Sequence, residues 1–171
     1  CQKYKAKYIK TKSSHRNGTE RIGEAAKKLN LKKKDLVIDV QGDEPFTDKE
    51  SLERVIEVFK GDKDKEIDLA SLMTKITDWD EINNPNTVKV ITDSRDFALY
   101  FSRSPIPYPR DKSINVSYFK HKGVYAFRKQ ALLDFYNTPM TILEDTEKIE
   151  CLRYLETGKK IKMVETEYMG I

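Results

Sequence analysis

The sequence predicts an α/β fold built on a mostly parallel central sheet. Short apolar or alternating runs typical of strands recur along the chain, and segments with helical composition or amphipathic spacing separate them. The 171 residues suit one domain, and the sequence shows no internal repeat and no linker long enough to divide it. We therefore expect residues 1–171 to form a single α/β domain.

The first half of the chain alternates between predicted strands and predicted helices. Strands are expected at 3–8 and 35–41, and helices at 19–29 and 51–59. Lysines alternate with tyrosine and alanine in the first of these segments, which places the lysines on a solvated face. Thr47 and Glu50 have the spacing of a capping box at the start of the second helix.

The second half continues the alternation. Strands are expected at 67–76, 87–92, 97–101, 123–127 and 161–165, and helices at 79–82, 129–136 and 146–157. Asp93 and Ser94 form the predicted turn between two of these strands. Gly158 follows the last helix at the position where a left-handed residue commonly ends a helix.

The charge distribution argues against a globally basic nucleic-acid-binding protein. The net charge of +4 comes from 32 Lys and Arg residues against 28 Asp and Glu residues. Residues 1–16 hold six of the positive side chains and no negative one, so the rest of the chain has 26 positive and 28 negative side chains. Nucleic-acid binding through residues 1–16 alone remains an alternative, and it would depend steeply on salt.

Neither export nor membrane insertion is indicated. The sequence has no signal peptide and no run of about 18 apolar residues, so we expect a cytoplasmic protein that contacts no membrane. Cys1 and Cys151 stand far apart, which argues against a disulfide framework and a cysteine metal site. Cys151 is interpreted as a buried helix residue.

The segment Val40-Gln41-Gly42-Asp43-Glu44-Pro45 directly follows a predicted buried strand. Ligands of open α/β sheets gather at the carboxyl ends of strands, and an Asp there can bind Mg²⁺. The alternative is a polar turn in which Asp43 caps the next segment. Composition alone favours the turn.

A second candidate is His15-Arg16-Asn17-Gly18-Thr19-Glu20-Arg21, at a predicted helix N-terminus. Its free backbone N–H groups can bind an anion. The alternative, which the residues alone favour, is an ordinary cap with Thr19 as the capping residue. The sequence has neither a Walker loop nor a GxGxxG motif.

Three further patterns are weak when each is taken alone. Tyr100 to Asp111 ends a strand and continues into a proline-rich loop that carries Arg103, and an Arg can fork onto a carboxylate or phosphate. His121 and Tyr125 share a face of a predicted strand. Glutamates recur at three-residue spacing, which usually indicates a solvated face; they are Glu144, Glu147 and Glu150.

Taken together, these segments resemble one family over nearly the whole chain: 3-deoxy-manno-octulosonate (Kdo) cytidylyltransferase, or CMP-Kdo synthetase. The matching pieces, in order, are HRNGTERIGE, DVQGDEP, NPNTVKVI, ALYFSRSPIPYPRD, HKGVYAFR, ILEDTEKIECLRYLETGKKI and MGI. The resemblance implies a three-layer, glycosyltransferase-A-like nucleotidyltransferase fold. It also implies transfer of CMP from CTP to the anomeric hydroxyl of Kdo, with release of pyrophosphate, for lipopolysaccharide synthesis.

The resemblance assigns roles to individual residues. It implies that Asp43 is a Mg²⁺ ligand and that Asp43 and Arg103 act in catalysis. Contacts to the sugar acid are implied for Gln41, Arg103, His121, Tyr125 and Glu144. The implied cytidine-nucleotide pocket contains His15, Gly18, Thr19 and Arg21. An Arg or His near the anionic sugar acid would neutralise its charge.

The sequence departs from the family pattern in two ways. Asn17 stands where the family has a serine, and it keeps a hydrogen-bonding side chain. The family's glycine- and basic-rich triphosphate segment and a second metal-binding Asp would lie before Cys1 and after Ile171. We therefore expect an internal and C-terminal fragment that is inactive alone, from an enzyme that forms a homodimer. The alternatives are an amino-substituted octulosonate as acceptor, or a binding subunit of the same fold without catalysis.

Overall fold

The computed structural model describes residues 7–42, 47–111 and 113–167. Its helices are α1 (Gly18–Lys28), α2 (Lys49–Gly61), α3 (Trp79–Asn83), α4 (Lys129–Asn137), α5 (Ile142–Glu147) and α6 (Cys151–Glu156). Its strands are β1 (Leu36–Val40), β2 (Leu69–Ile76), β3 (Lys89–Thr92), β4 (Ala98–Ser102), β5 (Tyr118–Arg128) and β6 (Ile161–Glu165). In the described ranges, none of the helices is long and apolar enough to cross a membrane. The predicted strand at 3–8 lies largely outside the described residues, and its last two residues have no regular structure.

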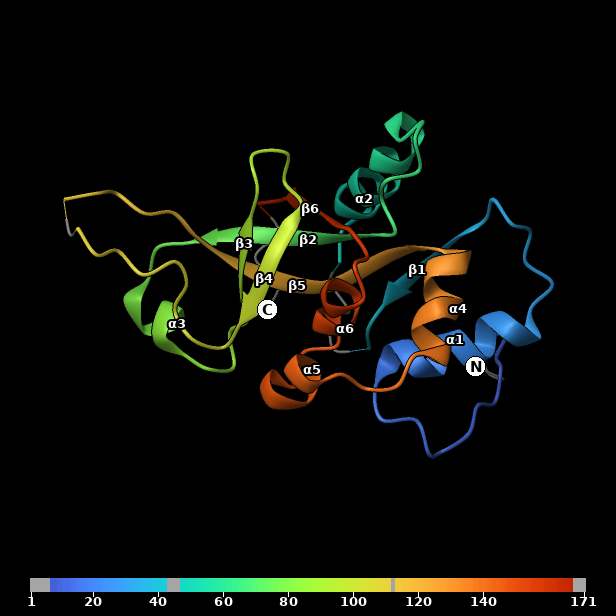
Figure 1. Ribbon diagram of the computed structural model, residues 1–171. Helices are drawn as coiled ribbons and strands as arrows, with labels where there is room; N and C mark the ends of the chain where they lie inside the picture. Colours follow the sequence, from blue (N-terminus) through green and yellow to red (C-terminus); the bar gives the residue numbers. More distant parts are fainter. Residues whose placement is uncertain (1–6, 43–46, 112, 168–171) are drawn as a thin grey trace.

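The sheet separates two layers of helices, so the three-layer α/β prediction is confirmed (Figure 1). On one face, Phe127 and Met163 of the sheet pack with Ala26 of α1, Leu132 of α4 and Leu152 of α6. On the opposite face, the core around Val55 of α2 is formed by alternate residues of the same strands; they are Ala70, Leu72, Val124, Ala126 and Val164. Cys151 is buried in α6, as predicted.

The expectation of a mostly parallel sheet is wrong for the strand pairs. The strand order is β4-β3-β5-β2-β6, with β1 on β5, and β2–β6 is the parallel pair among the described strands. β1 and β2 do run in the same direction, as a helical connection predicts, but β5 lies antiparallel between them. β5 comes much later in the sequence, so no local pattern could show this insertion.

A tight turn explains the antiparallel pairing of β3 with β4. Asp93 accepts hydrogen bonds at Oδ1 from the N–H groups of Arg95 (2.8 Å) and Phe97 (2.9 Å), which closes the predicted turn between β3 and β4. Such a short connection can join only antiparallel strands. The resulting hairpin pairs Val90 with Phe101 in the core.

Two helix predictions need correction. The cap of α2 is Asp48 rather than Thr47, because the carboxylate of Asp48 accepts from both the N–H (2.8 Å) and the hydroxyl (2.6 Å) of Ser51. The single helix predicted at 146–157 is two helices, α5 and α6, because Lys148 adopts a left-handed conformation (φ 55°). Gly158 (φ 75°) ends α6 as predicted.

β1 and β3 both pair with the same edge of β5, but with different residues of it. β1 ends where Val40 pairs with Val124, and β3 begins at Lys89, which pairs with Lys120. Residues 121–123 of β5 therefore face a gap between two strand ends. Gln41, the residue after β1, and Val88, the residue before β3, lie at this gap.

Gly23 sets how closely α1 approaches α4. A Cβ atom at Gly23 would lie 2.7 Å from Cβ of Tyr136, which is too close for a side-chain contact. Gly61, the exposed last residue of α2, has nothing within 4 Å of the same added atom. Substitution by alanine should therefore destabilise the fold at Gly23 but not at Gly61.

We predict that Gly23→Ala lowers the free energy of unfolding by about 1–3 kcal/mol, because the overlap outweighs the better helix propensity of alanine. Gly61→Ala should leave this free energy unchanged or raise it by up to about 1 kcal/mol. Urea unfolding of both variants beside the wild type measures the difference. A Gly23→Ala protein as stable as the Gly61→Ala protein would contradict the proposed close approach of α1 and α4.

Candidate functional site

A cavity of about 490 Å³ opens at the gap between β1 and β3. Its wall comes from the start of α1, the end of β1, the middle of β5 and the region from α5 to α6. The lining residues include Gly18, Gln41, His121, Tyr125, Glu144 and Glu150. The first five were predicted as site residues, and the fold brings them together from distant parts of the sequence.

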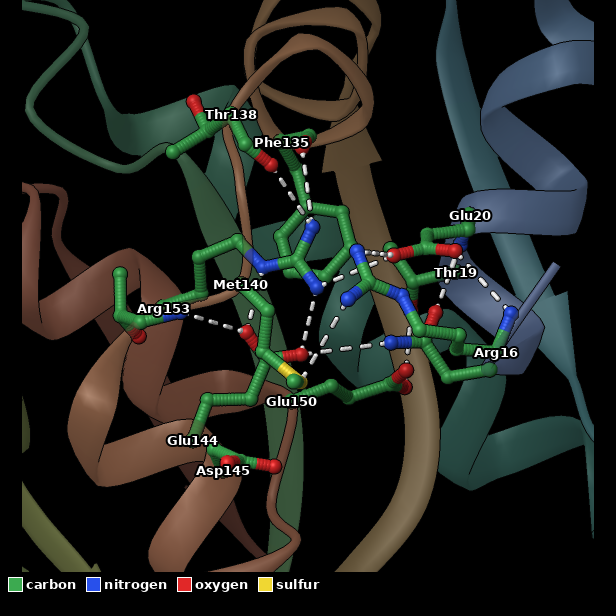
Figure 2. Close-up of polar contacts among 12 residues, drawn as sticks. Arg16, Thr19, Glu20, Phe135, Thr138, Met140, Glu144, Asp145, Glu150 and Arg153 are labelled. Carbon is green, nitrogen blue, oxygen red and sulfur yellow. Dashed lines mark hydrogen bonds and ion pairs between the residues drawn. The ribbon is translucent and has the colours of Figure 1, made fainter.

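The buried guanidinium of Arg153 joins the helices around this cavity (Figure 2). Its Nε and Nη2 atoms donate to the two carboxylate oxygens of Glu144, at 2.6 and 2.5 Å, and Nη2 also donates to Glu20 of α1 at 3.2 Å. Nη1 donates to the carbonyl oxygens of Phe135 (3.3 Å) and Thr138 (3.0 Å). Arg153 is 1% exposed, so these partners are what make the buried charge tolerable.

The glutamates at three-residue spacing do not form a solvated face, contrary to that interpretation. Glu144 is 4% exposed and is bound by Arg153, while Glu147 accepts from the backbone N–H of Arg103 (2.9 Å) and the hydroxyl of Ser102 (2.8 Å). Glu150 lines the cavity. Helix α5 ends at Glu147, and the left-handed Lys148 separates it from Glu150, so the three side chains do not share one exposed helix face. The spacing of the glutamates does not indicate that the helix ends there.

Asn17, rather than Thr19, caps α1. The side-chain oxygen of Asn17 accepts from the N–H of Glu20 at 2.8 Å, and its amide donates to Glu144 at 3.4 Å. Thr19, the second residue of α1, is buried, and its hydroxyl donates to Oε1 of Glu150 at 2.7 Å. Asn17 and Gly18, at the start of α1, therefore line the cavity. Thr19 does not line it, but its hydrogen bond positions Glu150, which does.

Glu150 is one of several polar residues of the cavity that sequence reasoning did not assign to the site; Asp145 and Lys148 are others. Its Oε2 atom is buried and has no hydrogen-bond partner among the described residues. Burial, with the negative charges of Asp39 and Glu144, raises the pKa of Glu150 to about 7 against the opposing hydrogen bond from Thr19. Near neutral pH this carboxyl can therefore either donate or accept a proton in a hydrogen bond.

His121 and Tyr125 are uncharged at neutral pH. Burial lowers the pKa of His121 to about 4, and burial raises the pKa of Tyr125 well above its usual value. The His121 ring lies edge-on to Phe101, with ring centroids 5.0 Å apart, and 5.5 Å from Tyr125. The floor of the cavity is thus polar without a fixed charge.

Arg103 lies in a neighbouring cavity of about 460 Å³ that shares Gln41, Val88 and His121 with the first. Its Nε donates to the carbonyl of Glu147 at 2.6 Å, and Nη1 donates to the carbonyl of Pro85 at 2.7 Å. Lys120 lines the same cavity. Lys120 is paired with Glu81, which lines the same cavity, whereas the guanidinium of Arg103 has no carboxylate partner among its hydrogen bonds to the described residues. Arg16 and Lys148 line the first cavity, so cationic side chains lie on both sides of the uncharged rings of His121 and Tyr125.

His15 and Arg21 do not line either cavity. His15 is hydrogen-bonded through Nε2 to Glu24, and Arg21 donates to the hydroxyl of Thr11 (2.7 Å) and the carbonyl of Lys12 (3.1 Å). Both side chains fix the segment before α1 against that helix. Asp43 lies outside the described residues. Within the described ranges, no group of three His, Cys, Asp or Glu side chains is placed to hold a metal ion.

Comparisons with known proteins agree with the architecture and the motifs. A family model described as Cytidylyltransferase matches residues 1–161. The chain is 61% identical over 165 residues to the 3-deoxy-manno-octulosonate cytidylyltransferase of Flavobacterium johnsoniae and 58% identical over 163 residues to that of Christiangramia forsetii. These matches cover 96% and 95% of the chain but only 66% and 64% of the two relatives.

Two solved structures are also similar. One is CMP:2-keto-3-deoxy-manno-octonic acid synthetase complexed with CTP, at a TM-score of 0.86 and 35% identity; the match covers 99% of this chain and 68% of that one. The other is a putative glucose-1-phosphate thymidylyltransferase from Bacillus anthracis, at a TM-score of 0.58 and 12% identity, covering 97% and 59%. The first match confirms the predicted nucleotidyltransferase fold, and the second is a likeness of fold alone.

The raised pKa of Glu150 predicts a pH-dependent gain from Glu150→Gln. The folded protein holds a proton on Glu150 up to about pH 7, whereas the unfolded chain loses it near the ordinary value of 4.5, so ionisation destabilises the fold as pH rises between these values. At pH 8 the variant should exceed the wild type in free energy of unfolding by about 1–3 kcal/mol. The gain should shrink towards pH 4.5.

Urea unfolding at several pH values measures this difference. Glu53→Gln is the matched control, because the side chain of Glu53 is 63% exposed on α2. A gain for Glu150→Gln that does not change with pH, or that Glu53→Gln shows equally, would contradict the prediction.

Proposed function

The chain belongs to the cytidylyltransferase family, and from this premise we propose that the protein transfers CMP from CTP to the anomeric hydroxyl of Kdo and releases pyrophosphate. One observation carries the proposal: motif residues far apart in the sequence, Gly18, Gln41, His121, Tyr125 and Glu144, line one cavity. The names of the most similar relatives support the choice of Kdo. The chain spans about two thirds of the length of those relatives, so the activity proposed is that of the full-length protein.

We propose that one Kdo molecule binds across the two neighbouring cavities. Kdo carries several hydroxyl groups and one carboxylate. The floor suits hydroxyl groups, because His121 and Tyr125 are uncharged there and Glu150 can either donate or accept a hydrogen bond near neutral pH. The carboxylate would lie nearer Arg103, because Lys120 of the same cavity is paired with Glu81. Nη2 of Arg103 also donates to the carbonyl oxygen of Lys148 at 3.4 Å, so three of the five N–H bonds of the guanidinium are used within the described residues and two remain.

The nucleotide would approach along the start of α1. Asn17 and Gly18 line the cavity there, and a helix N-terminus presents N–H groups to an anion. Thr19, His15 and Arg21 would act indirectly, by holding Glu150 and the segment before α1. In the reaction, the anomeric oxygen bonds to the α-phosphorus, the bond from that phosphorus to pyrophosphate breaks, and the hydroxyl proton is released.

Mg²⁺ is the proposed cofactor, with Asp43 as its protein ligand. Mg²⁺ commonly takes one or two carboxylates and completes its shell with phosphates and water, so a cluster of three acidic side chains is not required. Asp43 follows Gln41 and Gly42 at the end of β1, which is the strand end that borders the cavity. When bound, the ion would supply positive charge to the triphosphate.

We also propose that the full-length protein is a cytoplasmic homodimer. The loop between β4 and β5 projects from the sheet beside α3 (Figure 1). It contributes to a cavity of about 730 Å³, and the described residues that line this cavity carry no charge. Trp79, Tyr108 and Ile114 are 58%, 84% and 61% exposed there. A second copy of the chain would cover this apolar surface.

Light scattering at micromolar concentration measures the proposed dimer. The full-length protein should have twice the monomer mass, and Trp79→Ser with Ile114→Ser should shift it towards the monomer, because the substitutions remove exposed apolar area from the interface. Leu99→Ser, at an exposed residue of β4 outside this cavity, is the control. A monomeric wild-type mass would contradict the dimer.

We predict that the full-length protein releases pyrophosphate from CTP only when Kdo or a close relative is present. Coupled detection of pyrophosphate measures the release, with sialic acid and no acceptor as controls. A chelator should abolish the activity and added Mg²⁺ should restore it, because the triphosphate charge must be neutralised.

The outcomes of this assay separate the alternatives. Equal release with sialic acid, or without any acceptor, would contradict the Kdo assignment. A lower KM for an octulosonate with an amino group in place of a hydroxyl would favour that acceptor instead. Binding of CTP without turnover for any acceptor would favour a binding subunit.

A further inference from the structure

The imidazole of His121 is held from behind by a buried hydroxyl group. Oγ of Ser71, on β2, lies 2.9 Å from Nε2 of His121, on β5. Ser71 is fully buried, whereas the His121 ring lines both cavities of the site. Ser71 itself lines neither cavity, and the side chain of the site that its hydroxyl contacts is His121.

An irregularity in the sheet creates the position of Ser71. Ser71 pairs with Tyr125 of β5, but the next residue, Leu72, pairs with Lys122. Gly123 and Val124 are therefore extra residues on β5, and this bulge turns two carbonyl groups towards Ser71. Oγ of Ser71 lies 2.8 Å from the carbonyl oxygen of Val124 and 3.1 Å from that of Lys122.

Counting protons decides the direction of the Ser71–His121 hydrogen bond. The hydroxyl has one proton, and both carbonyl oxygens can only accept. If the proton were given to His121, the lone pairs of Oγ would face those of Val124 at 2.8 Å with no proton between them. The proton therefore goes to a carbonyl, and Oγ accepts from an N–H at Nε2 of His121.

We propose that Ser71 is a positioning residue that holds His121 as the Nε2–H tautomer, so that Nδ1 accepts a hydrogen bond from a hydroxyl group of the bound ligand. The ligand half of this inference rests on the proposed function, because a sugar acid supplies the hydroxyl. The tautomer half rests on the geometry of Ser71 alone. His121 then acts as a hydrogen-bond acceptor and not as a cation, contrary to the charge-neutralising role expected from the sequence.

Nitrogen NMR of the full-length protein labelled with ¹⁵N-histidine tests the tautomer. A His121→Gln variant identifies the signals of His121 directly. His121 should show one protonated nitrogen, assigned to Nε2, and its signals should not move between pH 6 and 8. In Ser71→Ala, both nitrogens should shift towards a mixture of the two tautomers.

Two further variants separate positioning from simple destabilisation. Ser71→Thr keeps the hydroxyl and should keep the Nε2–H tautomer. Thr74→Val removes another buried hydroxyl of the same strand, one that donates to the carbonyl of Thr166 at 3.0 Å, and should leave His121 unchanged. A proton on Nδ1 in the wild type, or an unchanged single tautomer in Ser71→Ala, would overturn the proposal.

Steady-state kinetics test the ligand half. Ser71→Ala should raise the KM for Kdo about fivefold, the effect of weakening one neutral hydrogen bond, while kcat and the KM for CTP change less than about twofold. An unchanged KM for Kdo beside an altered tautomer would show that Nδ1 does not contact the ligand. If the wild type does not use Kdo while the tautomer result holds, the proposed function fails and the role of Ser71 in orienting His121 stands.

Discussion

The buried charge of Arg153 is the constraint on which the rest of the site depends. A guanidinium that is 1% exposed must have its partners in place, because a buried charge without them costs several kcal/mol. The partners come from α1 through Glu20, from α4 and the segment after it through the carbonyls of Phe135 and Thr138, and from α5 through Glu144. Satisfying this one residue fixes the start of α1 and the joint between α5 and α6, and these two segments form much of the cavity wall.

The same constraint separates the roles of two neighbouring carboxylates. Both oxygens of Glu144 are bound by Arg153, so its charge is balanced within the fold. Glu150 receives one hydrogen bond, from Thr19, and keeps a buried oxygen without a partner among the described residues. The position of the cation therefore decides that Glu144 shapes the wall, whereas Glu150 keeps a carboxyl oxygen available inside it.

Local patterns predicted most helices and strands but not their arrangement or burial. Turn residues such as Asp93 and the helix stop at Gly158 act on their immediate neighbours, so the sequence shows them. The direction of β5 beside β1 and β2 depends on a segment that comes much later in the chain. The candidate site was found mainly through the family resemblance. Glu150 was interpreted as part of a solvated helix face, because the three-residue spacing cannot show that the helix ends at Lys148. Arg103 lies next to the cavity rather than in it, and Arg21 faces away.

The uncharged rings of His121 and Tyr125 on the floor of the cavity have a consequence for selectivity. A fixed charge attracts any ligand of opposite sign, and a water molecule can replace much of that attraction at small cost. A buried hydrogen-bonding group that is left unpaired is costly, so a neutral floor rejects ligands that lack the matching hydroxyl more strongly than a charged one does. This rejection requires that each group present one defined face to the ligand. Tyr125 and Glu150 are held by their burial and by Thr19, but an imidazole has two tautomers that differ little in energy. The bulge in β5 places the hydroxyl of Ser71 where it selects one tautomer of His121. An irregularity of the sheet thus contributes to ligand recognition.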